Sequence, residues 1–127
     1  MDLGSDAVAR ITGPNTSSWF GWDADNHLVA ADRRDKTATT YRSDGSKVGE
    51  WGRVGDSVTT TPDGSTILFF TNDYADQPPP MDIVSNGDRR KINVAGTSGG
   101  PPMLAPDGHA FLLSAYAGGK ELIIVSQ

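Results

Sequence analysis

The sequence contains no cysteine, which excludes disulfide staples, thiolate nucleophiles and cysteine-ligated zinc but leaves the redox compartment open. It also lacks long apolar runs: segments such as Leu122–Val125 fall far short of the roughly 20 residues that a membrane-spanning helix needs. The first residues, Met1–Asp6, carry neither the basic region nor the apolar run of a signal peptide. We therefore expect a soluble chain with no membrane contact, although a leader removed from a secreted parent would leave the same sequence.

Positive charge is scarce as well. Lys and Arg number 11 against 16 Asp and Glu, which gives the 127 residues a net charge of −5. A surface that follows nucleic-acid phosphates needs clustered Lys and Arg. The two basic runs, Arg33-Arg34 and Arg89–Lys91, adjoin aspartates and are interpreted as solvated strand edges. We expect no nucleic-acid partner.

Helical periodicity is the third absence. Fifteen glycines and eight prolines interrupt the chain along its whole length, and apolar residues do not recur at helical spacing between them. Short runs of β-branched and aromatic residues stand between turn signals instead. A chain of this length and pattern is predicted to be one all-β domain, residues 1–127.

An internal repeat is present. Thr61–Phe70, a Pro-Asp-Gly turn followed by an apolar strand, recurs as Ala105–Ser114, and Asp23–Ala31 is a weaker copy. A second turn, Ser43–Gly45, recurs 42 residues later as Ser85–Gly87. Two interleaved turn signals with a period near 40 residues predict a repeated unit of four short antiparallel strands.

In the second repeat we expect strands at about 57–61, 66–71, 81–85 and 90–94. The strand after the Pro-Asp-Gly turn is almost wholly apolar, which predicts burial on both of its faces. The inner strands of a β-propeller blade are buried in this way between neighbouring blades. The expected fold is therefore a set of three four-stranded β-propeller blades.

The Pro-Asp-Gly turn, its apolar strand and the later Asp/Asn-Gly turn resemble the TolB-type, WD40-like (PD40) propeller repeat, from about Val8 to Val125. The first copy departs from that pattern, with Ala24-Asp25-Asn26 in place of Pro-Asp-Gly. The resemblance implies blades at about 8–45, 46–87 and 88–127 and allows a periplasmic or secreted location. It implies less about function, since such repeats occur in TolB-like proteins, in gating propellers of prolyl-oligopeptidase-like enzymes and in many binding proteins.

The phase of the repeat bears on assembly. Val8–Thr12 matches the outermost strands of the later units, and the sequence stops after a third strand, Glu121–Val125. Three blades are too few to close, because propellers typically have about four to eight. We predict a homodimer that closes a six-bladed ring, in which each N-terminal strand completes the partner's last blade. The alternatives are a segment of a larger propeller and an engineered propeller with no natural ligand.

Candidate catalytic and metal-binding patterns are weak. Gly96–Gly100 fits the Gly-x-Ser-x-Gly motif of hydrolases, but the prolines that follow prevent the helix that this motif requires. His27 and His109 are interpreted as turn residues, and Asp23–Asn26 begins like a calcium loop but lacks its later ligands. We expect no enzymatic activity, no metal and no cofactor.

Binding residues are more readily suggested. Residues 72–80 form a long, proline-stiffened loop in which Tyr74 and Asp76 are candidate partner contacts. Trp19 and Trp22 either pack between blades or form an aromatic platform for a ligand. The predicted function is a non-enzymatic binding or scaffolding propeller that presents a protein- or peptide-binding surface. The alternative is an accessory or gating propeller of a hydrolase.

Overall fold

The computed structural model describes residues 8–11, 16–55, 57–71, 81–92, 102–115 and 121–126, with the side chains of 16–19, 110–115, 121–123 and 125 left out. All of the regular structure in these ranges is β-strand. No helix in the described part of the chain is long and apolar enough to cross a membrane.

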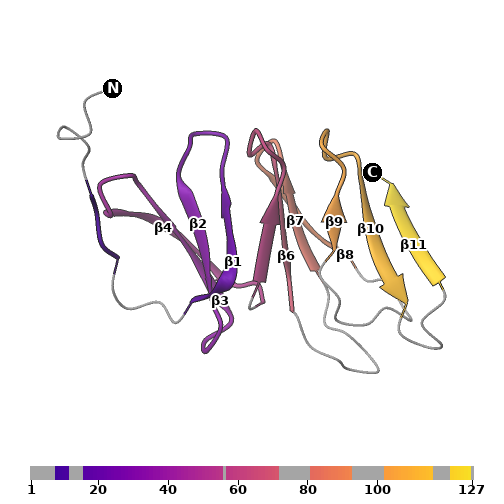
Figure 1. Ribbon diagram of the computed structural model, residues 1–127, viewed down its shortest axis with the longest axis horizontal. Helices are drawn as coiled ribbons and strands as arrows, with labels where there is room; N and C mark the ends of the chain where they lie inside the picture. Colours follow the sequence, from indigo (N-terminus) through magenta and orange to yellow (C-terminus); the bar gives the residue numbers. More distant parts are fainter. Residues whose placement is uncertain are drawn as a thin grey trace.

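The strands form three antiparallel sheets that stand side by side, face against face (Figure 1). Each sheet is a meander in which consecutive strands pair. The two predicted four-stranded sheets of the first and second repeats are confirmed, and the third sheet has three described strands. The strands of the first sheet are β1 (Thr16–Trp22), β2 (Leu28–Asp32), β3 (Thr37–Tyr41) and β4 (Lys47–Arg53); of the second, β5 (Ser57–Thr60), β6 (Thr66–Phe70), β7 (Met81–Ser85) and β8 (Asp88–Ile92); of the third, β9 (Met103–Leu104), β10 (Ala110–Ala115) and β11 (Glu121–Ser126).

The sheet boundaries are offset by one strand from the sequence units. Each sequence unit, at 8–45, 46–87 and 88–127, begins with an expected outer strand. In each four-stranded sheet of the structure the outer strand is the last strand along the chain. Strand β8 also starts two residues before the expected position at residue 90. The reason is local: Asn86 and Gly87 both have positive φ, 51° and 87°, so they turn the chain in two residues.

The first turn of each repeat has the same geometry in all three copies. Gly64 and Gly108 have φ of 74° and 76°, and Asn26 takes their place in the first copy with φ of 62°. In each turn the amide of this residue donates to the carbonyl three residues earlier, at distances of 2.9–3.1 Å. Asparagine is the residue other than glycine that best tolerates this backbone region, which explains how the departing first copy still makes the turn.

The two glycines also allow close packing between sheets. A Cβ on Gly64 would lie 2.3 Å from the backbone oxygen of Asp23, in the equivalent turn of the first sheet. A Cβ on Gly108 would lie 2.2 Å from the hydroxyl oxygen of Thr66 in the second sheet. Each Pro-Asp-Gly turn thus contacts the preceding sheet so closely that only glycine fits at this position.

The middle strand of the second sheet, β6, is buried on both faces as expected. Ile67 and Phe69 alternate with Leu68 and Phe70, so that the two pairs point to opposite faces. The first pair packs against the first sheet and the second pair packs toward the third. The cluster between the first and second sheets contains Val29, Ala31, Ala38, Val54, Val58, Ile67, Phe69 and Val84, and the second cluster contains Leu68, Phe70, Met81 and Ile83.

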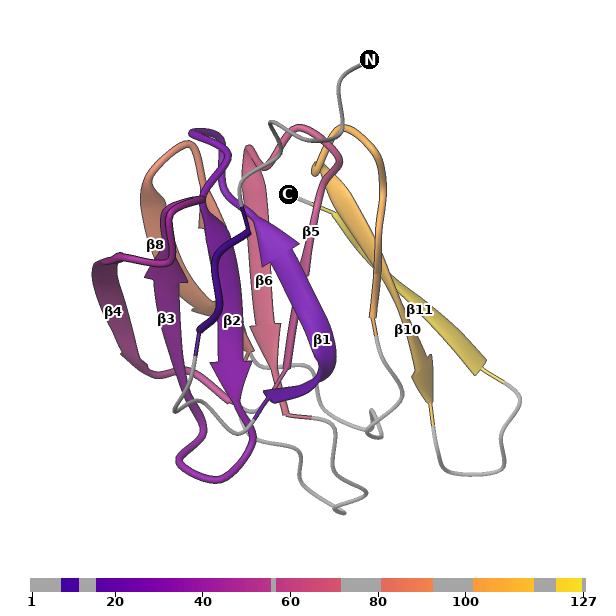
Figure 2. The same cartoon turned by 60° about the vertical axis from the view of Figure 1, so that its left-hand side comes forward.

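The innermost strands of adjacent sheets also touch. The amide of Trp22 in β1 donates to the hydroxyl of Thr60 in β5 at 3.4 Å, and a Cβ on Gly21 would lie 2.2 Å from the Thr60 methyl group. Figure 2 shows β1 and β5 toward one side of the stack and the outer strands β4 and β8 toward the other. The sheets therefore meet along their inner strands as well as across their faces.

The expected N-terminal strand over 8–12 is not present in its described part. Val8–Ile11 form no strand, and their backbone runs past the β3–β4 turn, where Ala9 and Arg10 approach Gly45 (Figure 1). A strand needs a neighbouring strand to satisfy its backbone groups. The open edge at β11 lies at the opposite end of the stack, so this segment does not reach it within one chain.

Candidate binding surfaces

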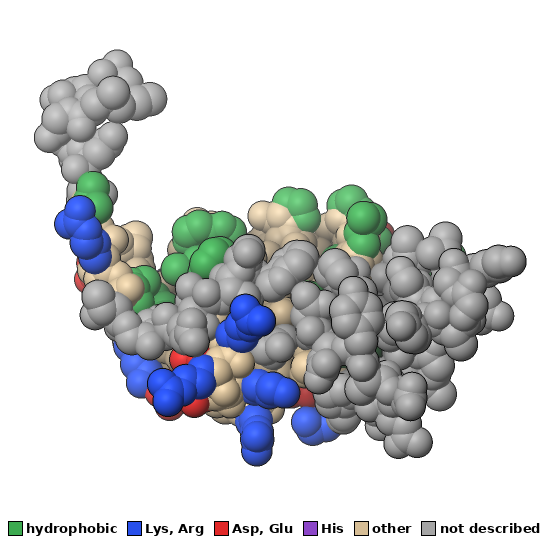
Figure 3. All heavy atoms as spheres, turned by 60° about the horizontal axis from the view of Figure 1, so that its bottom comes forward, with side chains coloured by type: hydrophobic (Ala, Val, Ile, Leu, Met, Phe, Trp, Pro, Cys, Tyr) green, Lys and Arg blue, Asp and Glu red, His purple; other side chains and the backbone are tan. Residues whose placement is uncertain are grey.

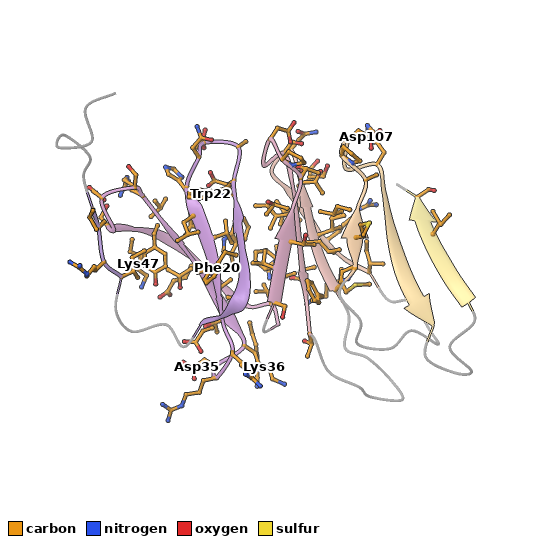
Figure 4. The ribbon with its side chains drawn as sticks, in the orientation of Figure 1. Phe20, Trp22, Asp35, Lys36, Lys47 and Asp107 are labelled. Carbon is orange, nitrogen blue, oxygen red and sulfur yellow. The ribbon has the colours of Figure 1, made fainter. Side chains whose placement is uncertain are left out.

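One face of the first sheet is turned away from the second sheet and carries exposed aromatic side chains. Phe20 pairs with Ala30 and Trp22 pairs with Leu28, so these residues share a face, while Gly21 between them contacts the second sheet. Phe20 and Trp22 are 49% and 53% exposed, and Figure 4 places both on β1. The first sheet therefore presents two large aromatic side chains on the face away from its neighbour.

The third sheet has a comparable face at the other end of the stack. Met103 and Ile124 both pair with Leu112, so they lie on one face of that sheet. Leu104, the neighbour of Met103, packs against the core shared with the second sheet, which places Met103 on the far side. Met103 and Ile124 are 69% and 70% exposed. Both ends of the three-sheet stack thus expose apolar side chains.

The binding residues suggested by the sequence fall in different places. Trp22 lies on the open face of the first sheet. The side chain of Trp19 and the whole of Tyr74 and Asp76 lie outside the described residues. Packing between sheets is instead the role of Trp51, whose ring lies 5.3 Å from that of Phe69.

Aspartates stabilise the turns at the ends of the sheets. The Asp63 carboxylate accepts hydrogen bonds from the Ser65 amide at 3.0 Å, the Ser65 hydroxyl at 2.8 Å and the Thr61 hydroxyl at 2.9 Å. These donors, with the Ser65 amide first, lower the pKa of Asp63. The hydroxyl and amide of Ser46 likewise lower the pKa of Asp44. These carboxylates serve the turns of the fold.

Asp23, Asp25 and His27 bring three potential metal-ligand atoms within 4.8 Å of one another. The contacts among them are those of a turn: the Asp23 carboxylate accepts the amides of Asp25 and His27, both at 2.9 Å, and lies 3.1 Å from the His27 Nδ1 atom. These contacts belong to the turn of the first copy. There the Asp23 side chain accepts hydrogen bonds from the turn amides, and in the second copy Thr61 occupies the equivalent position.

A cleft of about 240 Å³ lies between the first and second sheets at the end where β4 leads into β5. Its buried lining includes Asp82, which is 1% exposed. The Asp82 Oδ2 atom accepts Nε and Nη2 of Arg89 at 2.9 and 2.6 Å, and its Oδ1 accepts Nζ of Lys91 at 3.2 Å. The third nitrogen of the guanidinium, Nη1, donates to the Trp51 carbonyl at 2.9 Å and so connects the two sheets. The residues that line the cleft are Lys36, Arg53, Val54, Gly55, Thr71, Asp82 and Lys91.

Arg89–Lys91 lie on the exposed edge strand β8, as expected from the sequence. The cleft itself was not expected: Arg89 pairs with Val84 and Lys91 pairs with Asp82, which places both on the face toward the first sheet. The available signal was an aspartate inside an otherwise apolar strand, followed seven and nine residues later by cations. Such a carboxylate needs charged partners if the strand is buried.

Comparison with known proteins supports the fold alone. No protein-family model matches the sequence, and no curated protein matches it. Among solved structures, the chain is similar to one named Kuenenia stuttgartiensis hydrazine synthase, with a TM-score of 0.54 and 15% sequence identity over 84% of this chain. The match covers 36% of that chain, so this protein spans about a third of its length.

Proposed function

We propose that the chain supplies three consecutive blades of a β-propeller and acts as a binding or scaffolding module. The proposal rests on the stack of similar antiparallel sheets. In each sheet a turn of the same geometry joins the first two described strands. The TolB-type sequence pattern supports the same interpretation. In such a module the loops between strands present the surface for a protein or peptide, and the segment with Tyr74 and Asp76, between β6 and β7, is one of them.

The proposal includes assembly with a second copy of this chain. Each end of the stack leaves apolar side chains in water, at an expected cost of about 25 cal/mol for each Å². Two copies would bring six sheets together, a number that suits a closed ring. The face with Phe20 and Trp22 would then pack against the partner's third sheet. Val8–Thr12 would pair with the partner's β11 edge after leaving the β3–β4 turn.

Sedimentation over a range of micromolar concentrations tests this assembly. We expect the wild-type chain to be a dimer and the variant F20D/W22D to be a folded monomer, because two buried carboxylates would oppose the contact. The control is V48D, which places one such carboxylate at another exposed apolar residue, on β4, and F20D alone is compared with it. A monomeric wild type, or equal dissociation by V48D, would refute the assembly.

The alternative, a gating or accessory propeller of a hydrolase, differs in what it requires. It places the catalytic domain elsewhere on a longer chain and needs no dimer. Calorimetry distinguishes the scaffold from the hydrolase propeller. It measures the binding of peptides to the isolated dimer, for the wild type and for Y74A/D76A. A dimer that binds a peptide, and loses that binding in the variant, favours the scaffold. Unchanged binding in the variant would remove this loop from the proposal.

A further inference from the structure

We propose that the cleft between the first and second sheets binds a small molecule through its oxyanion groups, carboxylate or phosphate. The described lining of the cleft lies within one chain, so this inference does not rest on the proposed function. It uses residues that neither the repeat pattern nor the comparisons assign to a site.

Three cations reach the cleft from three separate parts of the fold. Lys36 closes the β2–β3 hairpin, Arg53 ends β4, and Lys91 lies on β8. The backbone beside them is fixed, because the carbonyl of Lys36 accepts the amides of Val54 at 3.0 Å and Gly55 at 3.1 Å. Figure 4 shows Lys36 at the tip of that hairpin, and Figure 3 shows Lys and Arg side chains gathered over this end of the molecule.

The charges on the described lining of the cleft do not balance. Within that set and the nearby Arg89, the cations Lys36, Arg53, Lys91 and Arg89 stand against one described carboxylate, Asp82, a formal surplus of three positive charges. Asp82 is already bound to Arg89 and Lys91. Neither Lys36 nor Arg53 forms an ion pair with any residue that the structure describes. This surplus stands in a chain of net charge −5, so it is a local feature.

The shape and donors of the cleft indicate the ligand class. Buried Val54 and Gly55 form its inner lining, while the cations stand at its more exposed rim. A volume of about 240 Å³ is below the range of roughly 300–1,000 Å³ typical of drug-sized ligands, which favours a compact molecule. The guanidinium of Arg53 can hold two oxygens of a carboxylate or phosphate at once, and the hydroxyl of Thr71 adds a neutral donor.

Isothermal titration calorimetry at low ionic strength tests the proposal with two probes, inorganic phosphate and succinate. We expect at least one to bind the wild-type protein, and R53A to weaken that binding about tenfold or more, as loss of a charge-assisted hydrogen bond would. Added salt should weaken it as well. The matched control is K47A, which removes one positive charge from the other end of β4, where Lys47 pairs with Glu50.

Each further result has an assigned meaning. Binding of phosphate alone or of succinate alone identifies which oxyanion the cleft takes, and R53K, which keeps charge but loses the fork, should weaken that binding as well. Absence of binding by both probes at millimolar concentration overturns the proposal, as does equal weakening by K47A. Should R53A fail to fold, amide NMR shifts in the wild-type protein titrated with the probe decide the question. Shifts of Val54, Gly55 and Thr71 support the cleft as the binding site, and shifts confined to other residues overturn the proposal.

Discussion

The first and second sheets have the same strand order but different surroundings. In the second sheet, β6 buries Ile67 and Phe69 on one face and Leu68 and Phe70 on the other. In the first sheet, Val29 of β2 packs toward the second sheet, while the opposite face of β1 leaves large aromatic side chains half exposed. The counterpart of β6 in the first sheet, β2, is also buried at its centre, with Ala30 on the side of Phe20 only 3% exposed. The difference therefore lies at β1, whose large aromatic side chains face away from every other described sheet.

The interfaces on the two sides of the second sheet differ as well. The described core toward the third sheet is apolar, with Ile92 and Leu104 packed against its buried cluster. The interface with the first sheet combines an apolar cluster with the Asp82 ion pairs at its outer edge. Burial of a carboxylate costs more than apolar packing gains unless its partners are in place. The ion pairs hold Arg89 in place within the second sheet, and its hydrogen bond to the Trp51 carbonyl links that sheet to the first beside the cleft.

The largest effect should come from truncating the buried middle strand. Phe69→Ala removes a ring that is fully buried and contacts Trp51, and we expect the free energy of unfolding in urea to fall by about 3–5 kcal/mol. Phe20→Ala is the matched change on the open face. In the monomer it should lower the free energy of unfolding by no more than about 0.5 kcal/mol. If the proposed dimer forms, the cost of Phe20→Ala will grow with protein concentration. Equal costs for the two variants at low concentration would break the comparison.

A smaller loss of stability is expected from substitutions in the turns that contact the preceding sheet. Gly64→Ala forces a side chain into a positive-φ position and against the Asp23 carbonyl, so we expect a loss of about 1–3 kcal/mol. Gly49→Ala is the control, because its φ is ordinary and a Cβ there meets nothing within 4 Å; its cost should stay within about 0.5 kcal/mol. Chemical denaturation of both variants measures the difference. A tolerated alanine at residue 64 would contradict the close approach of this turn to the first sheet.

Much of the fold could be predicted from the sequence because its signals are local. The turn dipeptides and the doubly apolar strand at Thr66–Phe70 specify hairpins and burial within about ten residues of each other. Within one chain Val8–Ile11 form no strand, because similarity to an outer strand does not by itself bring a partner edge within reach; the pairing of Val8–Thr12 with a second copy stays a prediction. The arrangement of the sheets into a propeller stays a prediction.

The candidate sites were harder to predict because their parts are distant in sequence. Lys36, Arg53 and Lys91 meet only after two sheets pack, and each by itself resembles an ordinary solvated cation. The side on which Arg89 and Lys91 lie depends on the register of β8, which the length of the preceding turn decides. Trp22 carried a better signal, since a large aromatic side chain on an inner strand predicts either packing or a ligand surface.

The smallest effect concerns pH and the turn of the second sheet. The hydrogen bonds that lower the pKa of Asp63 stabilise the fold only while the carboxylate is ionised. A pKa lowered by folding gives stability that is present above the unfolded value of about 4 and is lost as pH falls through the folded value. Asp63→Asn should therefore destabilise the protein near neutral pH, and the gap to wild type should narrow below about pH 4. Thermal unfolding followed by circular dichroism from about pH 7 to about pH 2 measures this gap; a constant difference across that range would mean that the carboxylate charge does not stabilise the turn.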